Sequence, residues 1–252
     1  MKNHFITPYV GNKRNETPRI YESMNFKGIK TIVEPFCGSC AMSFYISTKH
    51  PKIFKYVLND NNKHLISMLK ICSVPEELQA FEEKINEVAK SLTSKEIYNE
   101  VVKEDTCVAW FIKNKIYNIR PGLFPLKYEY KHINIKDCPI INFLQNEEIT
   151  LTNECGVECF KKYTSKENLI FIDPPYLNSC NSFYYDAGVN VYEYFFNNDI
   201  KTFKCKILLC LESIWIMNLL FKKNVKSTYV KKYELSKRKT EHIIITNYKE
   251  VI

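Results

Sequence analysis

The sequence predicts an open α/β domain with a mostly parallel sheet and a helical insertion. Short apolar runs over 31–33, 54–58 and 169–172 have the length and composition of buried parallel strands. Each run is followed by polar or acidic residues, as at the ligand-binding edge of such a sheet. Between the second and third runs, residues 73–150 show helical periodicity, so this stretch is expected to be inserted into the α/β domain.

The sequence Asp173-Pro174-Pro175-Tyr176 follows the apolar run 169–172 directly. Two prolines exclude both strand pairing and helix, so the backbone is expected to leave the sheet in a fixed extended shape. The Asp173 carboxylate and the Pro174 carbonyl are two neighbouring acceptors, which suit an amino group with two hydrogens. The Tyr176 ring offers a flat face for stacking. The pattern predicts a site that binds the exocyclic amino group of a nucleobase and directs its nitrogen at an electrophile. A surface turn with a core tyrosine is the simpler alternative.

The composition is that of a soluble globular protein, with 45% hydrophobic and 25% charged residues among 252. The net charge of +8 suits a polyanionic partner, although solubility alone accounts for it. No signal peptide is expected, and no apolar run reaches the length of about 18 residues that a membrane span needs. The ten cysteines are expected to be reduced thiols. The Cys37-x-x-Cys40 spacing lacks a second ligand pair, so no metal is expected.

The N-terminal segment 7–14 combines a glycine with a cation and a ring. Gly11 permits a tight turn, Lys13 presents a positive charge and Tyr9 a flat face. Together they could hold a carboxylate and an adenine-like ring. From these residues alone, a disordered basic N-terminus is favoured.

The first strand is followed by a turn over 34–39, in which Gly38 allows the backbone to approach a ligand. A helix over 40–47 is expected next, with its N-terminus facing the ligand. A single glycine is not a dinucleotide fingerprint. Asp60 lies about 20 residues beyond Gly38, the spacing of an acidic residue that accepts hydrogen bonds from ribose hydroxyls. The alternative role for Asp60 is a cap on the helix expected over 63–72.

The insertion begins with a helix at Pro75, whose apolar face repeats at spacings of three and four. This face consists of Leu78, Phe81, Ile85, Val88 and Leu92. Thr93-x-x-Glu96 predicts a capping box for a second helix, and a third is expected over about 106–117. The stretch 113–132 then interleaves cations with rings, a composition that suits nucleic-acid phosphates and bases. A solvated loop fits the same stretch equally well.

After Tyr176 the chain is polar and aromatic from Asn178 to Tyr192, and is expected to form a loop over a pocket. A strand over 206–211 and a helix over 214–222 follow. The runs 229–235 and 242–247 are expected to form a closing hairpin around a basic turn.

Taken together, these motifs resemble the D12 class of DNA adenine-N6 methyltransferases, which includes the Dam-type enzymes. The resemblance is carried by an ordered set of segments that spans nearly the whole chain: 8–14, 33–39, 58–61, 173–176 and 241–248. Two positions depart from the family pattern. The family usually has a second glycine where Cys40 stands, and often a glycine where Asn12 stands.

The resemblance implies a Rossmann-like fold that uses S-adenosylmethionine, with a catalytic domain of residues 1–72 and 151–252 and a target-recognition insertion over 73–150. The catalytic residues would be Asp173, Pro174, Pro175 and Tyr176. The cofactor-binding residues would be Tyr9, Gly11, Lys13, Glu34, Phe36, Gly38, Asp60 and Asp173. The DNA-binding residues would be Lys115, Arg120, Lys127, Tyr128, Lys131, Lys237 and Arg238.

The implied reaction is transfer of a methyl group from S-adenosylmethionine to N6 of an adenine flipped out of double-stranded DNA, with no metal. Methylation of adenine in RNA or of cytosine N4 in DNA remains open, because the acceptor pair fits these amino groups as well. A catalytically silent DNA-binding homologue is the alternative from another class. An intracellular protein, in the cytoplasm or with the DNA, is expected.

Overall fold

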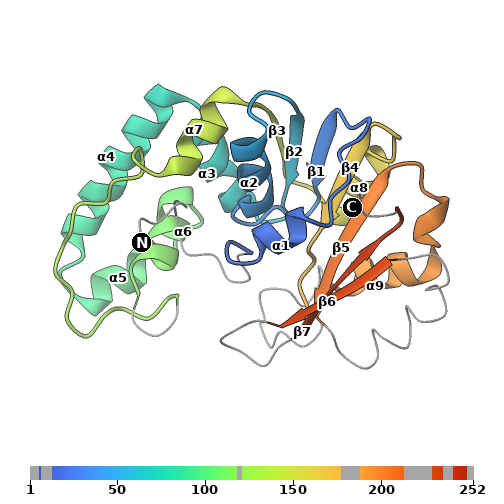
Figure 1. The fold of residues 1–252 in the computed structure, drawn as a ribbon. Helices are drawn as coiled ribbons and strands as arrows, with labels where there is room; N and C mark the ends of the chain where they lie inside the picture. Colours follow the sequence, from blue (N-terminus) through green and yellow to red (C-terminus); the bar gives the residue numbers. More distant parts are fainter. Residues whose placement is uncertain are drawn as a thin grey trace. The chain divides into compact units, whose positions relative to one another are not determined.

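The computed structural model describes residues 6, 13–117, 121–176, 188–212, 229–234 and 241–248. The chain divides into two compact units (Figure 1). Unit 1 comprises Met1–Asn12 and Asn62–Glu147, and unit 2 comprises Lys13–Asn61 and Glu148–Ile252. The role of residues 73–150 as a target-recognition insertion remains a prediction.

Unit 2 contains a seven-stranded sheet with the order β3-β2-β1-β4-β5-β7-β6. The strands are β1 (Thr31–Glu34), β2 (Lys55–Asn59), β3 (Glu148–Thr152), β4 (Asn168–Ile172), β5 (Lys206–Glu212), β6 (Tyr229–Glu234) and β7 (Glu241–Thr246). Strands β3, β2, β1, β4 and β5 pair in parallel, and β7 is antiparallel to both β5 and β6. This topology confirms the predicted α/β class and the closing hairpin. The strand order reverses between β1 and β4, where open α/β sheets bind ligands.

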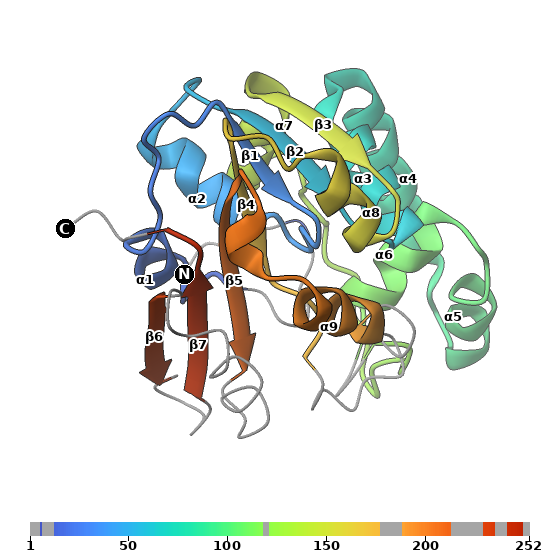
Figure 2. The same cartoon turned by 90° about the vertical axis from the view of Figure 1, so that its right-hand side faces the viewer.

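Helices lie on both faces of this sheet (Figure 2). They are α1 (Thr17–Tyr21), α2 (Ala41–Lys49), α8 (Gly156–Lys162) and α9 (Gly188–Asn197), with a short 3-10 helix, η1 (Ile200–Thr202). Helix α1 packs on α2, and α8 packs on α9. Parallel strands that are covered on both faces are apolar throughout, which is why 169–172 could be predicted as a strand.

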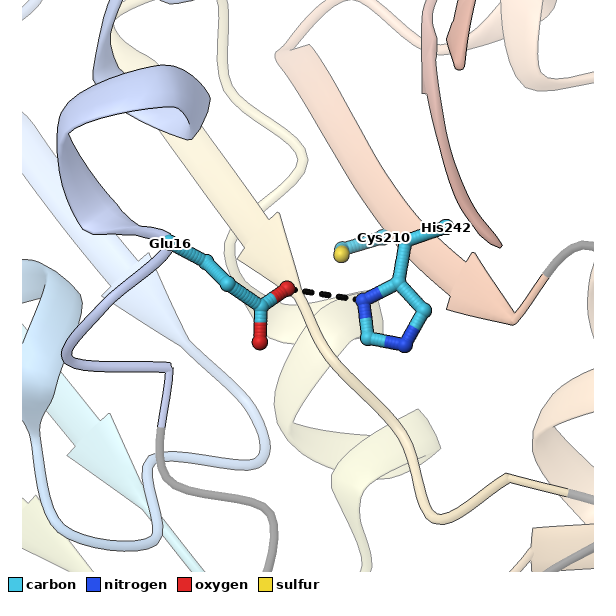
Figure 3. A group of neighbouring side chains, drawn as sticks. All are labelled: Glu16, Cys210 and His242. Atoms are coloured by element: carbon cyan, nitrogen blue, oxygen red, sulfur yellow. Dashed lines mark hydrogen bonds and ion pairs between the residues drawn. The ribbon is translucent and has the colours of Figure 1, made fainter. Parts of the chain in front are cut away.

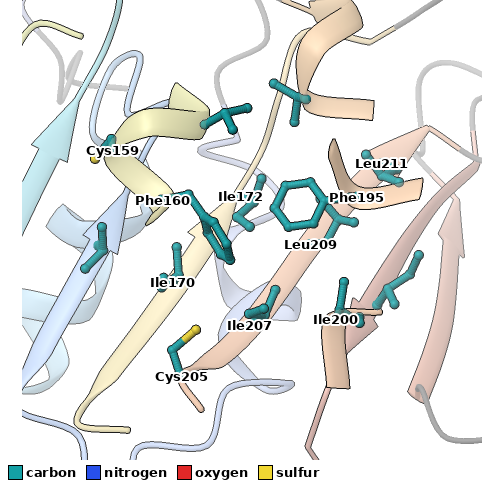
Figure 4. Close-up of a cluster of buried hydrophobic side chains, with 14 of the residues drawn as sticks. Cys159, Phe160, Ile170, Ile172, Phe195, Ile200, Cys205, Ile207, Leu209 and Leu211 are labelled. Carbon is teal, nitrogen blue, oxygen red and sulfur yellow. The ribbon is translucent and has the colours of Figure 1, made fainter. Parts of the chain in front are cut away.

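The core between the sheet and α8 and α9 follows the strand period of two (Figure 4). Ile207, Leu209 and Leu211 of β5 point into this cluster. They pack there with Phe160 of α8 and Phe195 of α9, whose rings meet edge to face at 5.1 Å. The intervening residues of β5 therefore face the opposite side of the sheet.

Unit 1 is helical, with α3 (Lys63–Ser73), α4 (Pro75–Ser91), α5 (Lys95–Val101), α6 (Cys107–Lys115) and α7 (Pro139–Asn146) among its described residues. Helix α3 packs on α4, α6 and α7. The predicted apolar face of α4 is confirmed, since Leu78, Phe81 and Ile85 are buried. The Phe81 ring meets Phe111 of α6 edge to face at 5.9 Å. None of the described helices combines the length and the apolar character that a membrane crossing needs.

One predicted helix cap is wrong, and one alternative cap is excluded. Helix α5 is capped by Ser94, whose hydroxyl accepts from the Ile97 amide at 3.4 Å, and not by Thr93. Ser94 has the extended backbone of an N-cap, and a hydroxyl one residue earlier is out of register with the first turn. Helix α3 is capped by Asn62, which accepts from two amides of the first turn, so the capping alternative for Asp60 is excluded.

The loop predicted over 178–192 is also wrong at its end. Residues from Gly188 onward form α9, and Tyr192 is buried in the cluster against the sheet. Tyr192 and Phe195 are one helical turn apart, so both rings face the core from the same side of α9. The polar residues around them hide this pattern in the sequence. Residues 177–187 and the helix predicted over 214–222 lie outside the described residues.

Asn59, the last residue of β2, joins the ends of three neighbouring strands. Its buried side-chain amide donates to the carbonyls of Pro35 and Glu154 at 2.9 and 3.0 Å. Its side-chain oxygen accepts from the Thr152 hydroxyl and the Glu154 amide at 2.9 and 3.0 Å. This one side chain therefore satisfies polar groups that follow β1, end β3 and begin the connection to α8.

We expect Asn59→Ala to lower the free energy of unfolding by about 3 kcal/mol, because several buried partners lose their hydrogen bonds at once. Urea unfolding measures the change. The control is Asn142→Ala on the exposed face of α7, which is expected to change stability by less than about 0.5 kcal/mol. Equal midpoints for wild type and Asn59→Ala would contradict the proposed role of this side chain.

Candidate functional site

Three carboxylates follow three neighbouring strands at one edge of the sheet in unit 2. Glu34 is the last residue of β1, Asp60 comes directly after β2, and Asp173 comes directly after β4. Strand β1 lies between β2 and β4 and is parallel to both, so these strand ends meet at the same edge. This edge contains the reversal of strand order.

Asp173 forms a buried ion pair with Lys13. The Lys13 Nζ lies 2.9 Å from Oδ2 of Asp173, with side-chain exposures of 6% and 15%. Burial lowers the pKa of Lys13, but the nearby Asp173 and Glu16 outweigh it and raise the pKa above the usual value. Lys13 is therefore charged at neutral pH, and it fixes the N-terminal segment to the end of β4.

Tyr176 belongs to the same cluster. Its hydroxyl donates to Oδ1 of Asp173 at 3.1 Å, and the Lys13 Nζ lies 4.8 Å from the centre of its ring. Its hydroxyl also lies 3.8 Å from the Cys210 sulfur. Pro174 is buried, and the carbonyl of Pro175 accepts a hydrogen bond from the α9 residue Tyr192 at 3.2 Å. The half-buried Tyr176 thus lies at the site edge and not inside the core.

The turn after β1 is tied to the end of β2. The Gly38 amide donates to Oδ2 of the buried Asp60 at 3.1 Å, and the Cys37 amide donates to the Asn59 carbonyl at 2.8 Å. Gly38 has a φ of 47° and Cys40 a φ of 57°, both in the left-handed region. The family pattern has a glycine where Cys40 stands, and this backbone conformation is the one that glycine adopts most easily.

Glu34 forms a hydrogen bond with the first turn of α2. Its Oε1 accepts from the Ser43 amide at 2.6 Å, which satisfies a donor in the first turn of the helix. Burial raises the pKa of Glu34 to about 7, with a smaller contribution from Asp173 and an opposing one from Ser43. Glu34 therefore titrates near neutral pH.

Phe36 packs on the backbone at the start of α8. A Cβ at Gly156 would overlap the Phe36 ring, so this close approach requires a glycine. Phe36 is one of the residues predicted to line the cofactor site, and Gly156 gives its ring room.

A second buried group adjoins Tyr176 and was missed in the sequence analysis. The His242 Nδ1 and the Glu16 Oε2 lie 2.7 Å apart, and both side chains are buried (Figure 3). The His242 ring meets the Tyr176 ring edge to face at 5.2 Å. His242 lies in the segment 241–248 that carries part of the family resemblance, but no spacing motif relates it to Glu16, so the pair itself could not be predicted.

The predicted DNA-binding residues that the structure describes all lie in unit 1. Lys127 and Lys131 are exposed, whereas Tyr128 is half-buried and its hydroxyl donates to the Ala89 carbonyl at 3.0 Å. The Lys115 Nζ donates to the Ile6 carbonyl at 3.3 Å, and burial lowers its pKa. The remaining predicted site residues, Tyr9, Gly11, Arg120, Lys237 and Arg238, lie outside the described residues.

Part of the candidate site lies in a segment that matches a known protein family. Residues 9–121 match the family described as D12 class N6 adenine-specific DNA methyltransferase. The predicted family resemblance is confirmed. The match to the D12 class includes Lys13, the Gly38 turn and Asp60, and it ends before Asp173.

A curated relative covers almost the whole chain. It is the type II methyltransferase M.CviBI of Paramecium bursaria Chlorella virus NC1A, which is 22% identical over 96% of this chain and 99% of its own length. Among solved structures, a methyltransferase from Pyrococcus furiosus aligns with a TM-score of 0.41 and 11% identity over 95% of this chain and 85% of that one. A human methyltransferase 10 domain containing protein aligns with a TM-score of 0.45 and 5% identity over 93% and 81%. The two structural alignments are too distant to support a conclusion about function.

Glu34 predicts a pH dependence of stability. Its pKa is about 7 in the folded chain against 4.5 in a model peptide, so between these values the native state binds more protons than the unfolded state. Stability is therefore expected to fall as pH rises from 4.5 to about 7. Glu34→Gln keeps an acceptor for the Ser43 amide without a charge, so its advantage over wild type should grow across this window, to at most about 3 kcal/mol.

Urea unfolding at about pH 5 and about pH 8 measures this difference. The exposed substitution Glu129→Gln is the control, with an expected change of less than about 0.5 kcal/mol at either pH. A difference between Glu34→Gln and wild type that stays constant with pH would contradict the buried, protonatable state of Glu34.

Gly156 predicts a specific coupling to Phe36. We expect Gly156→Ala to lower the free energy of unfolding by about 1–3 kcal/mol, because the added methyl group overlaps the ring. In a Phe36→Ala background the same change should cost nothing, since the overlapping ring is gone. A double-mutant cycle by urea unfolding measures the coupling. Equal effects of Gly156→Ala in both backgrounds would argue against the contact.

Proposed function

We propose that this protein transfers a methyl group from S-adenosylmethionine to the N6 amino group of adenine in double-stranded DNA. One observation carries the proposal: Asp173, paired with Lys13 and Tyr176, follows β4 beside the Gly38 turn of β1, where the strand order reverses. The D12-class match over residues 9–121 and the type II methyltransferase relative support methylation of DNA.

The residues at this edge fit the cofactor. The turn after β1 uses two left-handed residues, which keeps its backbone close to the strand ends, and the buried Asp60 carboxylate stands beside the Gly38 amide. The residues that would hold S-adenosylmethionine are Tyr9, Gly11, Lys13, Glu34, Phe36, Gly38, Asp60 and Asp173. When bound, the cofactor supplies a methyl group that is activated by the positive charge on its sulfur.

Asp173 and Pro174 would orient the adenine amino group that receives the methyl group. The Asp173 carboxylate and the Pro174 carbonyl accept the two hydrogens of the adenine amino group, which aims the nitrogen lone pair at the methyl carbon. Lys13 fixes the carboxylate at 2.9 Å, so this acceptor is positioned before the base arrives. Tyr176 stacks on the base for about 1–3 kcal/mol, against a cost of a few kcal/mol for taking the base out of the duplex.

DNA contact is proposed for the basic and aromatic segment of unit 1. Lys127 and Lys131 are exposed there, and the anchored Tyr128 lies between them in the chain. The proposal extends to Lys115, Arg120, Lys237 and Arg238. Contacts of this kind are made mainly to phosphates, so binding should weaken steeply with salt.

Asp173→Asn is expected to reduce methyl transfer at least about 10²-fold, because the amide has one acceptor oxygen and no charge for the developing positive charge on nitrogen. Transfer of tritium from labelled S-adenosylmethionine to duplex DNA measures the rate, and unfolding midpoints confirm that the variant is folded. The control is Asp199→Asn, an exposed helix cap that asparagine serves equally well. Equal incorporation by Asp173→Asn and wild type would reject the assignment.

Analysis of the labelled nucleosides identifies the acceptor. N6-methyladenine from duplex DNA is the expected product. Label in N4-methylcytosine, or incorporation into RNA in place of DNA, would move the proposal to the corresponding amino group. Cofactor binding without transfer to any nucleic acid would favour a catalytically silent homologue.

A further inference from the structure

Glu16, Cys210 and His242 bring three potential metal ligands together in unit 2. One ligand atom from each, a carboxylate oxygen, a sulfur and an imidazole nitrogen, lies within 4.8 Å of the other two (Figure 3). The residues are 8%, 0% and 4% exposed, respectively. Buried charged groups are paired or coordinate metals, and here the pair of Glu16 and His242 lies beside a buried thiol.

The backbone determines this convergence. Cys210 pairs with Ile244 across β5 and β7, so His242, two residues earlier in β7, is its diagonal neighbour on the same face of the sheet. Leu211 and Ile243 point to the opposite face, into the core cluster. Glu16 occupies the position before α1, in a turn where its amide donates to the Lys13 carbonyl at 2.7 Å. The three side chains are thus placed by strand register and by a short turn.

The donor set selects a class of ion. Thiolate, imidazole and carboxylate are the ligands of zinc and similar thiophilic divalent ions, whereas magnesium and calcium prefer oxygen alone. The charges also balance, since a divalent ion with one thiolate and one carboxylate is neutral overall. A neutral group is the arrangement that a buried site tolerates best.

We propose that Glu16, Cys210 and His242 form a binding site for a thiophilic divalent metal ion of the zinc class. Binding would convert the Cys210 thiol to a thiolate, whose proton passes to solvent. The hydrogen between His242 Nδ1 and Glu16 would exchange through solvent to Nε2, so that the imidazole stays neutral, Glu16 stays a carboxylate and Nδ1 binds the ion. Three protein ligands leave a fourth position for water or another group.

The ion would act through Tyr176 on the proposed methyl-transfer site around Asp173. The Tyr176 hydroxyl lies 3.8 Å from the Cys210 sulfur, and its ring centre lies 5.2 Å from that of His242. An ion that recruits both groups changes both contacts of the ring, so we expect it to slow methyl transfer. This consequence rests on the proposed function, whereas the metal site itself does not.

The site is tested with Co²⁺ on the reduced, metal-free protein, with neither cofactor nor DNA present. We expect one equivalent to give thiolate-to-cobalt charge-transfer absorption, which Zn²⁺ abolishes by displacement. Cys210→Ser should lose this absorption, and His242→Gln and Glu16→Gln should weaken binding at least about tenfold. Cys155→Ser, which changes an exposed thiol, is the matched control and should bind as wild type does.

X-ray absorption of the zinc-loaded wild type gives a result that needs no variant. One sulfur with nitrogen and oxygen ligands is expected. No stoichiometric binding, two or more sulfur ligands, or a cobalt spectrum that survives Cys210→Ser would overturn the proposed site. Zinc should also slow methyl transfer by wild type more than by Cys210→Ser, each relative to its own metal-free rate. If zinc slows wild type and Cys210→Ser equally, the proposed coupling to Tyr176 is overturned, whereas the proposed metal site is not.

Discussion

The ion pair between Lys13 and Asp173 is the interaction on which the candidate site depends. It joins two motif segments that lie far apart in the sequence, because Lys13 comes before α1 and Asp173 directly follows β4. Both side chains are largely buried, so neither charge is satisfied by water. Removing one partner of such a pair costs about 3–5 kcal/mol, because the other is left as an uncompensated charge. Lys13 is therefore part of the candidate site in unit 2.

The carboxylates around this pair avoid mutual repulsion in different ways. Asp173 faces Lys13, Asp60 faces the Gly38 amide, and Glu16 faces His242. Glu34 has its pKa raised by burial, so it can take up a proton near neutral pH. Among the described residues, Lys13 and several acids can thus share one sheet edge. Perturbed acids at a sheet edge are what a binding site leads one to expect.

The sequence predicted those parts of the fold that carry a local signal. The predicted strands 31–33, 54–58 and 169–172 were recognisable because strands covered on both faces are mainly apolar. Strand β3 was missed because it is a half-exposed edge strand of alternating polar residues, over Glu148–Thr152. The contact between Glu16 and His242 could not be predicted either, since it joins the turn before α1 to β7, and no spacing in the sequence relates the two. The same holds for Phe36 and Gly156.

Pro174 and Pro175 restrict the backbone of the Asp173–Tyr176 motif to an extended shape. They do not determine where the motif lies in the structure. Position comes from its anchors: Lys13 on Asp173, Tyr176 on Asp173, and Tyr192 on the Pro175 carbonyl. These anchors come from the N-terminal segment, from the motif itself and from α9. An arm that is stiff and fixed at several points loses little entropy when a base binds, which is the condition for catalysis by positioning. The position of the motif therefore depends on Lys13 and α9 as well as on its own four residues.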